Sequence, residues 1–303
     1  MPGRMLRVWP FALLMLTHAA AWPGNAPAAE TKIAVQQLRP GLHLLSGAGG
    51  NVVVWHGPSG TLMVDAGVAL LAPQLLAAVQ EIAPGPVRVV ISTHWDPDHT
   101  GGNEQLGESG SLLVAHDNVR ARMSEPQAVA GDDLEVPAAP AGALPVLTFD
   151  DALSLHLNGD RLAALHVESA HTDGDVLLWW EDANVVHVGD IYYSGMYPFI
   201  DLGSGGSLAG LVAALETVLS RADSRTIIIP GHGPVSNRTE LAAYRDMVVA
   251  TGRRVRELID EGKSLDEVRA ARPTAAYDAV YGQGSMTADR FVGILYEDLA
   301  GRR

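Results

Sequence analysis

The sequence predicts a mixed α/β fold, in which short apolar strands alternate with segments of helical periodicity. Residues 87–91 form an apolar run broken only by Arg88, which is typical of a buried strand. Residues 70–82 before it carry apolar side chains at helical spacing and end at a Pro-Gly-Pro turn. Directly after the strand, two His and two Asp lie within six residues, from His94 to His99. The ends of strands are where α/β proteins commonly bind ligands, so this point is predicted to be functional.

The remaining elements follow from short apolar segments that are bounded by Gly, Pro and Ser turns. Strands are predicted at residues 34–38, 42–46, 52–56, 61–64, 112–115, 153–157, 161–166, 176–180, 184–188 and 226–229. Helices are predicted at residues 118–123, at residues 208–219 and in the chain from residue 239 onward. Asp117 and Ser207 are predicted to cap the first two of these helices. His116 is interpreted as a packing or hydrogen-bonding residue rather than as a metal ligand.

Residues 125–145 form the longest irregular connection in the sequence, rich in Ala, Pro, Gly and acidic residues. Long connections inside compact domains are often lids or walls of a substrate site. A surface insertion without such a role is the alternative.

The composition defines the general class of the protein. With 303 residues, 47% hydrophobic and 18% charged, the chain is long enough and apolar enough for a sizeable core. The net charge of −14 argues against general binding to nucleic acid, which requires a basic face, but leaves a nucleotide substrate possible. No cysteine is present, so any metal must be held by nitrogen and oxygen donors.

Residues 1–28 have the features of a signal peptide. Arg4 and Arg7 precede an apolar stretch at residues 8–16, and Ala26-Pro27-Ala28 offers a cleavage site of small residues. The apolar stretch is too short for a permanent membrane span, so no transmembrane anchor is expected after cleavage. The predicted location is a bacterial periplasm or the exterior, and an uncleaved anchor is the alternative.

Side chains that bind metal ions follow four of the predicted strands. The donors are His94, Asp96, Asp98, His99, His171, Asp190 and His232. Seven nitrogen and oxygen donors exceed what a single structural ion requires and match a site for two metals. Glycines beside several of them allow the backbone to pass close to the ions.

The order His-x-Asp-x-Asp-His, then a separate His, an Asp after Gly, and Gly-His-Gly resembles the metallo-β-lactamase superfamily. This resemblance extends from residue 33 to 303 and implies a single domain, a four-layer αββα sandwich with helices at its C-terminus. It implies that the first metal is bound by His94, Asp96 and His171, and the second by Asp98, His99 and His232. It further implies that Asp190 bridges both metals and that Asp65 supports the site from behind the ligands.

Two positions depart from common members of that superfamily. Asp96 stands where most have the second His of the His-x-His-x-Asp-His motif. A carboxylate is a harder donor than imidazole, so zinc is weakened relative to iron or manganese. The flavodiiron branch similarly has an acidic residue there. Asp190 stands where zinc-cysteine lactamases have Cys, and in this the chain is similar to glyoxalase II, lactonases and ribonuclease Z.

The resemblance implies a binuclear hydrolase with two divalent ions, expected to be zinc, with iron or manganese as alternatives. A hydroxide bridging the metals would cleave an ester, thioester, lactone or amide bond, a β-lactam included, in a small molecule. Asp98 is expected to orient this nucleophile. Tyr192, Tyr193 and Tyr197 either line the substrate pocket or pack in the core. A serine hydrolase is unsupported, because no Gly-x-Ser-x-Gly occurs.

Two other functions remain open at this point. A di-iron redox protein is favoured by the carboxylate at Asp96, and a binding protein whose site no longer turns over is the third possibility. The oligomeric state is left open by the sequence.

Overall fold

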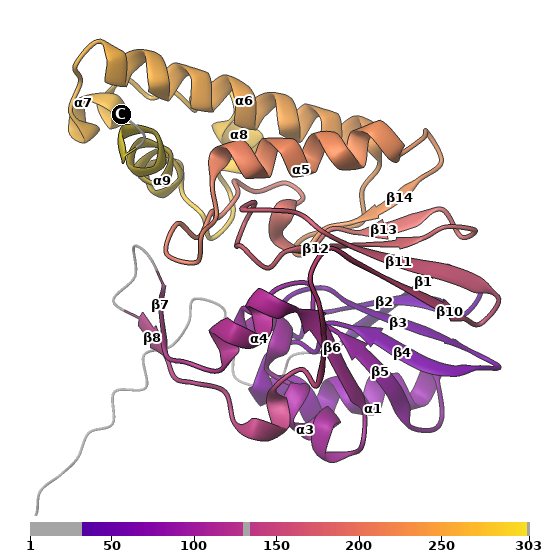
Figure 1. The fold of residues 1–303 in the computed structure, drawn as a ribbon. Coiled ribbons are helices and arrows are strands. Elements are labelled where there is room, and N and C mark those ends of the chain that lie inside the picture. The colour runs from indigo at the N-terminus through magenta and orange to yellow at the C-terminus, as the bar shows by residue number, and fades with distance from the viewer. Residues whose placement is uncertain (1–31, 130–133, 302–303) are drawn as a thin grey trace, which may run out of the picture.

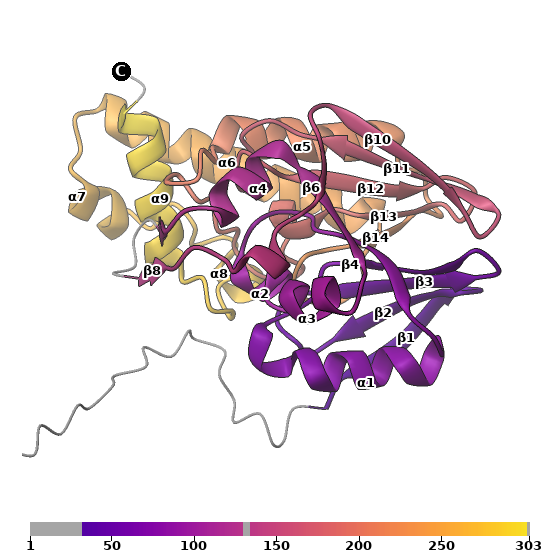
Figure 2. The same cartoon turned by 60° about the horizontal axis from the view of Figure 1, so that its bottom comes forward.

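Two β-sheets packed face to face form the centre of the molecule, and helices cover both outer faces (Figure 1). The fold is known from a computed structural model that describes residues 32–129 and 134–301. The predicted signal peptide at residues 1–28 lies outside the described residues. The N-terminal half of the chain forms one sheet with its helices, and the C-terminal half forms the other (Figures 1 and 2). The predicted four-layer αββα arrangement is therefore confirmed.

The first sheet contains seven strands among the described residues, in the order β1-β2-β3-β4-β5-β6-β9. Its first four strands are antiparallel, whereas β4, β5, β6 and β9 run parallel. The strands are β1 (Ala34–Arg39), β2 (Leu42–Ser46), β3 (Val52–Gly57), β4 (Gly60–Val64), β5 (Val87–Ile91), β6 (Leu112–His116) and β9 (Leu147–Phe149).

The second sheet of the described chain has five strands in the order β10-β11-β12-β13-β14, of which only the last pair is parallel. They are β10 (Ala152–Leu157), β11 (Asp160–His166), β12 (Val176–Trp180), β13 (Val185–His187) and β14 (Ile227–Ile229). A separate antiparallel pair consists of β7 (Gln127–Val129) and β8 (Leu134–Val136).

The helices flank these sheets on opposite sides, with α1 and α3 on the outer face of the first sheet and α5 and α6 on that of the second (Figures 1 and 2). The α-helices are α1 (Ala72–Ile82), α2 (Pro97–Thr100), α3 (Asn103–Glu108), α4 (Asp117–Met123), α5 (Leu208–Arg221), α6 (Arg238–Asp260), α7 (Leu265–Ala270), α8 (Asp278–Tyr281) and α9 (Ala288–Gly301). Short 3-10 turns occur at Ala69–Leu71, Ala141–Ala143 and Gly189–Ile191. Over residues 32–129 and 134–301, the structure shows no helix with the length and apolar character of a membrane span.

The alternation of side chains along β3 explains how the layers are held together. Val53 and Trp55 point to the space between the sheets, whereas Val52 and Val54 pack beneath α1. Successive side chains of a strand point to opposite faces, so this fully apolar strand contributes to two cores. Between the sheets, Trp55 packs edge-on against Trp180 with ring centroids 6.2 Å apart. Burial of large aromatic side chains in this way is a main source of stability for the interface of the two sheets.

The helices use apolar stripes to cover the sheets, as their sequence periodicity predicts. In α1, Leu75 and Val79 lie four residues apart and are both buried against the first sheet. In α5, Leu211 and Leu215 have the same spacing and pack in the core of the second half. Ser207 caps α5 by accepting a hydrogen bond from the Gly210 amide, so that prediction is confirmed.

Three details differ from the sequence-based expectations. Helix α4 begins at Asp117, and its cap is His116, whose Nδ1 accepts a hydrogen bond from the Asn118 amide. The expected cap at Asp117 is therefore wrong, whereas the hydrogen-bonding role expected for His116 is confirmed. The connection at residues 125–145 contains the β7–β8 pair instead of being wholly irregular. Strand β9 was not expected, because three residues are too few to show a period.

Candidate metal centre

The loop after β5 places its donors on two different sides of one short helical turn. His94 and Asp96 lie before α2, and Asp96 has a non-helical ψ of 143°. Pro97 then starts α2, because its fixed φ suits the first position of a helix. Asp98 and His99 lie inside this turn, so their side chains leave in another direction. The motif that is continuous in sequence is thus divided between two groups of donors.

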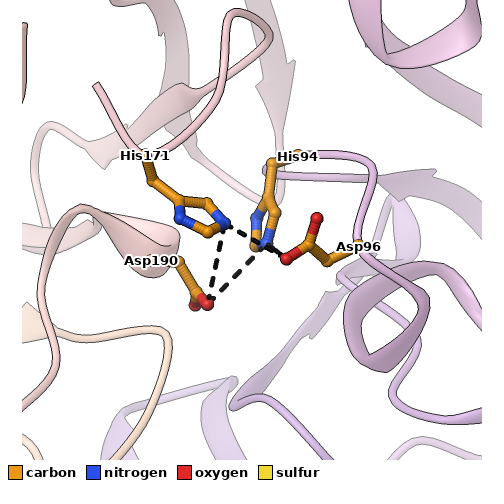
Figure 3. Close-up of side chains that lie close together, drawn as sticks. All are labelled: His94, Asp96, His171 and Asp190. Carbon is orange, nitrogen blue, oxygen red and sulfur yellow. Dashed lines mark hydrogen bonds and ion pairs between the residues drawn. The ribbon is translucent and has the colours of Figure 1, made fainter. Parts of the chain in front are cut away.

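The first group consists of His94, Asp96, His171 and Asp190, whose side chains point toward one another from three segments of the chain (Figure 3). The Oδ2 atom of Asp96 lies 3.2 Å from Nε2 of His171 and 3.6 Å from Nε2 of His94. Nε2 of His94 lies 3.8 Å from Oδ2 of Asp190. One donor atom from each residue falls within 4.8 Å of the others, and all four residues are buried.

The second group consists of Asp98, His99 and His232, and Asp190 lies between the two groups. Nε2 of His232 lies 3.2 Å from Oδ2 of Asp98 and 3.3 Å from Nε2 of His99. Asp190 reaches this group through both oxygens, with Oδ1 at 3.1 Å from Nε2 of His99 and Oδ2 at 3.4 Å from Nε2 of His232. The carboxylate of Asp190 therefore faces imidazoles of both groups.

The donor atoms have the chemistry that divalent cations require. Nε2 of His94 and Oδ1 of Asp96 are buried and have no hydrogen-bond partner within the described part of the chain. Buried polar atoms normally have partners, so such orphans need a ligand to explain them. Nε2 atoms of His99 and His232 face each other, and a cation beside them would accept both lone pairs. The residues therefore fit a pair of metal sites.

The buried charges raise the pKa of His171 and of His232 and lower that of Asp96 and of Asp190. Burial disfavours the imidazolium form of His171, but the Asp96 carboxylate outweighs this and raises the pKa of His171 to about 10. Asp190 likewise outweighs burial at His232 and raises its pKa to about 10. Burial alone would raise the pKa of Asp96 and of Asp190, but the facing imidazoles hold both below their usual range. The carboxylates of Asp96 and Asp190 stay ionised, and a metal would replace the extra protons of His171 and His232.

Asp65 lies behind the donors and links the two groups. Its Oδ2 accepts hydrogen bonds from Nδ1 of His99 at 2.8 Å and from Oγ1 of Thr93 at 2.8 Å. Oγ1 of Thr93 also lies 2.9 Å from Nδ1 of His94. Asp65 has a φ of 62°, an unusual value that places its carboxylate where the site needs it. Such partners fix the ring orientation of a metal-binding His.

We expect Asp65→Asn to weaken zinc binding roughly 10- to 100-fold, the usual loss when a partner behind a ligand is changed. An amide has no charge to hold the proton on Nδ1 of His99, so Nε2 becomes a poorer donor. Asn also tolerates a positive φ, so the fold should survive. Zinc titration followed by calorimetry measures the effect, and an affinity equal to that of the wild type would contradict the role of Asp65.

The three tyrosines after Asp190 differ in position. Tyr193 donates a hydrogen bond to Oδ2 of Asp190 and stacks on the ring of His232, with centroids 5.3 Å apart and planes 5° apart. Tyr192 and Tyr197 are buried in the core of the second half, at 3% and 0% exposure. Their hydroxyls bond to Ser236 and Asp278 and do not reach the donors. Of the three tyrosines, Tyr193 contacts the donors, whereas Tyr192 and Tyr197 follow the alternative of packing in the core.

Several residues around the centre were missed by sequence reasoning. Asp175 accepts hydrogen bonds from the amides of His171 and Thr172 at 2.6 and 2.9 Å, and so holds the turn that presents His171. The carbonyl of Phe199 lies 3.0 Å from Nδ1 of His171 and orients that ring. The sequence did carry a signal for this turn, because Asp175 follows His171 by four residues and Asp commonly bonds to nearby backbone amides in turns. Nothing in the sequence points to the carbonyl of Phe199.

One family profile and several known proteins are similar to this chain. The sequence profile described as "Metallo-beta-lactamase superfamily" matches residues 46–244. "Linear primary-alkylsulfatase" from Pseudomonas sp. (strain ATCC 19151) is 24% identical over 253 residues, covering 70% of this chain and 47% of the relative. "Probable metallo-hydrolase YqgX" from Bacillus subtilis (strain 168) is 26% identical over 156 residues, covering 48% of this chain and 68% of the relative.

Solved structures show the same fold. The sec-alkylsulfatase Pisa1 from Pseudomonas sp. gives a TM-score of 0.63 at 16% identity, covering 88% of this chain and 50% of that one. A metallo-β-lactamase from Pontibacter korlensis gives 0.59 at 16% identity, covering 72% of this chain and 99% of that one. This chain thus spans about half the length of the alkylsulfatases that it matches. Since the superfamily profile matches well over half of its residues, the chain belongs to the metallo-β-lactamase superfamily.

Proposed function

We propose that this protein is a binuclear metal-dependent hydrolase that acts on a small molecule. The observation that carries the proposal is the pair of buried donor groups that share the carboxylate of Asp190. The first metal would be held by His94, Asp96 and His171, and the second by Asp98, His99 and His232, with Asp190 between them. The names of the curated relatives, a metallo-hydrolase and an alkylsulfatase, support hydrolysis.

Two divalent ions bound there would acidify a water molecule and polarise the bond to be cleaved. The residues of the chain would direct the approach of the substrate and orient the attacking water. The side chains of Asp98 and His232 are 12% and 25% exposed, more than the other donors, so substrate would approach from their side. Within the described part of the chain, Oδ2 of Asp98 faces the imidazoles of His99 and His232, so its other oxygen can orient the attacking water and hold its proton. The hydroxyl of Tyr193 donates its proton to Oδ2 of Asp190 and so would hold this carboxylate in place between the two metals.

The proposed substrates are esters, thioesters, lactones and amides, β-lactams included. Sulfate esters join this set, because an alkylsulfatase is among the relatives and alkylsulfatases are among the structural matches. In all of these reactions an activated water displaces a leaving group, and bound metal ions would stabilise the negative charge that develops. The test therefore includes substrates with a carbon centre and a substrate with a sulfur centre.

The test combines metal analysis with a panel of substrates. We expect about two zinc equivalents per chain by mass spectrometry, in line with a two-metal site. The zinc-loaded protein should hydrolyse at least one member of a panel that contains an aryl ester, a thioester, a lactone, a β-lactam and an alkyl sulfate, and chelation should abolish this activity. Zinc binding without turnover of any member would instead favour a binding protein.

A redox function is the second candidate, and Asp96 is the observation that favours it. This carboxylate lies 3.2 Å from Nε2 of His171 inside the first donor group, and with it the seven donors comprise four imidazoles and three carboxylates. With the Asp96 carboxylate in place of a third imidazole, the first donor group suits iron or manganese better than it would with three imidazoles.

Asp96→His separates the two functions. For a zinc hydrolase, we expect the variant to bind zinc at least as tightly and to keep or increase hydrolysis, because imidazole suits zinc and one buried negative charge is lost. For an iron redox protein, the same variant should lose iron and oxygen-dependent turnover. Metal content and both activities, measured on wild type and variant side by side, give opposite patterns in the two cases. Loss of all zinc from a folded variant would contradict the placement of residue 96 beside the metal.

The cellular location and the kind of binding partner are further parts of the proposal. We propose export of the protein through residues 1–28 and a small-molecule substrate without nucleic acid as a partner, in keeping with the net charge of −14.

A further inference from the structure

The loop between β2 and β3 contacts Asp98 and His99 of the second donor group and the residues on either side of His232, although no residue of the loop is itself a metal donor. We infer that Gly49, Gly50 and Asn51 form a template that sets the geometry of Asp98, His99 and His232 and thereby controls the metal affinity of this group alone. The inference rests on the proposed function, since it assumes that the group binds a metal.

Asn51 forms hydrogen bonds with the backbone on both sides of His232. Its side-chain amide donates to the carbonyls of Pro230 and Gly233, both at 2.9 Å, which lie on either side of His232 in the chain. Its backbone amide donates to the carbonyl of Gly231 at 2.7 Å. Asn51 is only 4% exposed, so these bonds are shielded from water and costly to lose. The loop after β14 is therefore fixed to the opposite sheet at three carbonyls around the ligand.

The two glycines contact the other members of the group. The amide of Gly50 donates to the carbonyl of Asp98 at 3.1 Å. A Cβ atom at Gly50 would overlap the His99 ring, including Nε2, and a Cβ at Gly49 would lie 2.8 Å from the Asp98 carbonyl oxygen. Because neither position has a side chain, the backbone of Gly49 and Gly50 packs directly against Asp98 and His99 and fixes their positions.

The first donor group is oriented by other segments. His171 is held by the Asp175 carboxylate and by the carbonyl of Phe199, and Nδ1 of His94 faces Thr93. Loss of the Asn51 side chain should consequently reach the second group and spare His94, Asp96 and His171, the donors of the first group that are held by other segments. This selectivity distinguishes a positioning role from a general contribution to stability, which would weaken both groups together.

The chain offers a matched control at the other end of β3. Asn158 also donates from its side-chain amide to a carbonyl of the opposite sheet, that of Gly60, at 3.1 Å. This bond joins the first residue of β4 to the turn between β10 and β11, at the opposite end of β4 from the donors. Asn158→Ala therefore removes the same kind of bond between the two sheets without touching the metal centre.

The first measurement titrates Zn²⁺ into metal-free wild type, Asn51→Ala and Asn158→Ala. We expect two equivalents for wild type and for Asn158→Ala, whereas in Asn51→Ala one of the two equivalents should bind about 10- to 100-fold more weakly. Thermal unfolding of the metal-free proteins shows whether each is folded. If Asn51→Ala does not fold, Asn51→Asp carries the same test, because it keeps the volume but turns a carboxylate oxygen toward the two carbonyls.

Double variants identify which group is affected. Added to His171→Ala, which retains only an intact second group, Asn51→Ala should weaken the remaining equivalent by the same factor as in the single variant. His232→Ala already lacks the second group. Adding Asn51→Ala to it should therefore leave the affinity of the remaining zinc equivalent unchanged, since effects that act through one site do not add. Equal weakening in both backgrounds, or none in either, would overturn the inference. Failure of the wild type to bind two zinc ions would instead overturn the proposed binuclear site, so the two failures are distinct.

Discussion

His171→Ala and His232→Ala should each lower hydrolysis by more than about a hundredfold and remove one of two zinc equivalents. Loss of a residue behind a ligand already costs 10- to 100-fold, and loss of the ligand itself should cost at least as much. His171 is buried beside Asp96 at 3.2 Å, and His232 lies 3.2 Å from Asp98, so each variant also leaves a buried carboxylate without its neutralising partner. The measurements are kcat/KM and metal content by mass spectrometry.

His156→Ala is the control for both variants. His156 is an exposed residue of β10 and contributes to neither donor group, so its replacement should leave rate and metal content unchanged. Unchanged metal content in both His171→Ala and His232→Ala would refute the assignment of these residues as ligands.

Gly231→Ala should lower both metal occupancy and the stability of the fold. A Cβ atom at this position would overlap Oδ1 of Asp190 and would lie 2.7 Å from the carbonyl carbon of Gly189. The backbone at Gly189 cannot give way, because Gly231 donates its amide to the Gly189 carbonyl at 2.7 Å. Forcing extra volume into a packed site costs about 1–3 kcal/mol, and here the carboxylate between the two groups must move as well.

Gly142→Ala gives the matched comparison, since a Cβ there would meet only side-chain carbons at 3.6 and 3.8 Å. We expect Gly142→Ala to bind two zinc ions and to unfold within about 0.5 kcal/mol of wild type, as is usual for substitutions that meet no obstacle. Chemical denaturation and zinc titration of the two variants measure the difference. If Gly231→Ala retained full occupancy and stability, Asp190 would not be held where the structure places it.

Much of the fold was predictable because it depends on local periodicity. The apolar run at residues 87–91 and the helical spacing at residues 70–82 correspond to β5 and α1 with nearly the predicted bounds. Strand β9 and the β7–β8 pair escaped prediction, because three-residue strands owe their pairing to a neighbouring strand and not to their own sequence. The sequence likewise left open whether Tyr192 and Tyr197 point into the core or the pocket, since packing in the tertiary structure decides which side of a loop is buried.

By itself, the sequence determined which chemical groups are available: four imidazoles and three carboxylates with no thiolate, each next to a strand end. Only the tertiary structure decided how they combine. The helical turn that starts at Pro97 separates Asp96 from Asp98, so that one continuous motif supplies both donor groups. Asn51 acts through the carbonyls around His232, about 180 residues away in the chain. Any residue can offer a carbonyl, so contacts of this kind leave no signature in the sequence and become visible only when the chain is folded.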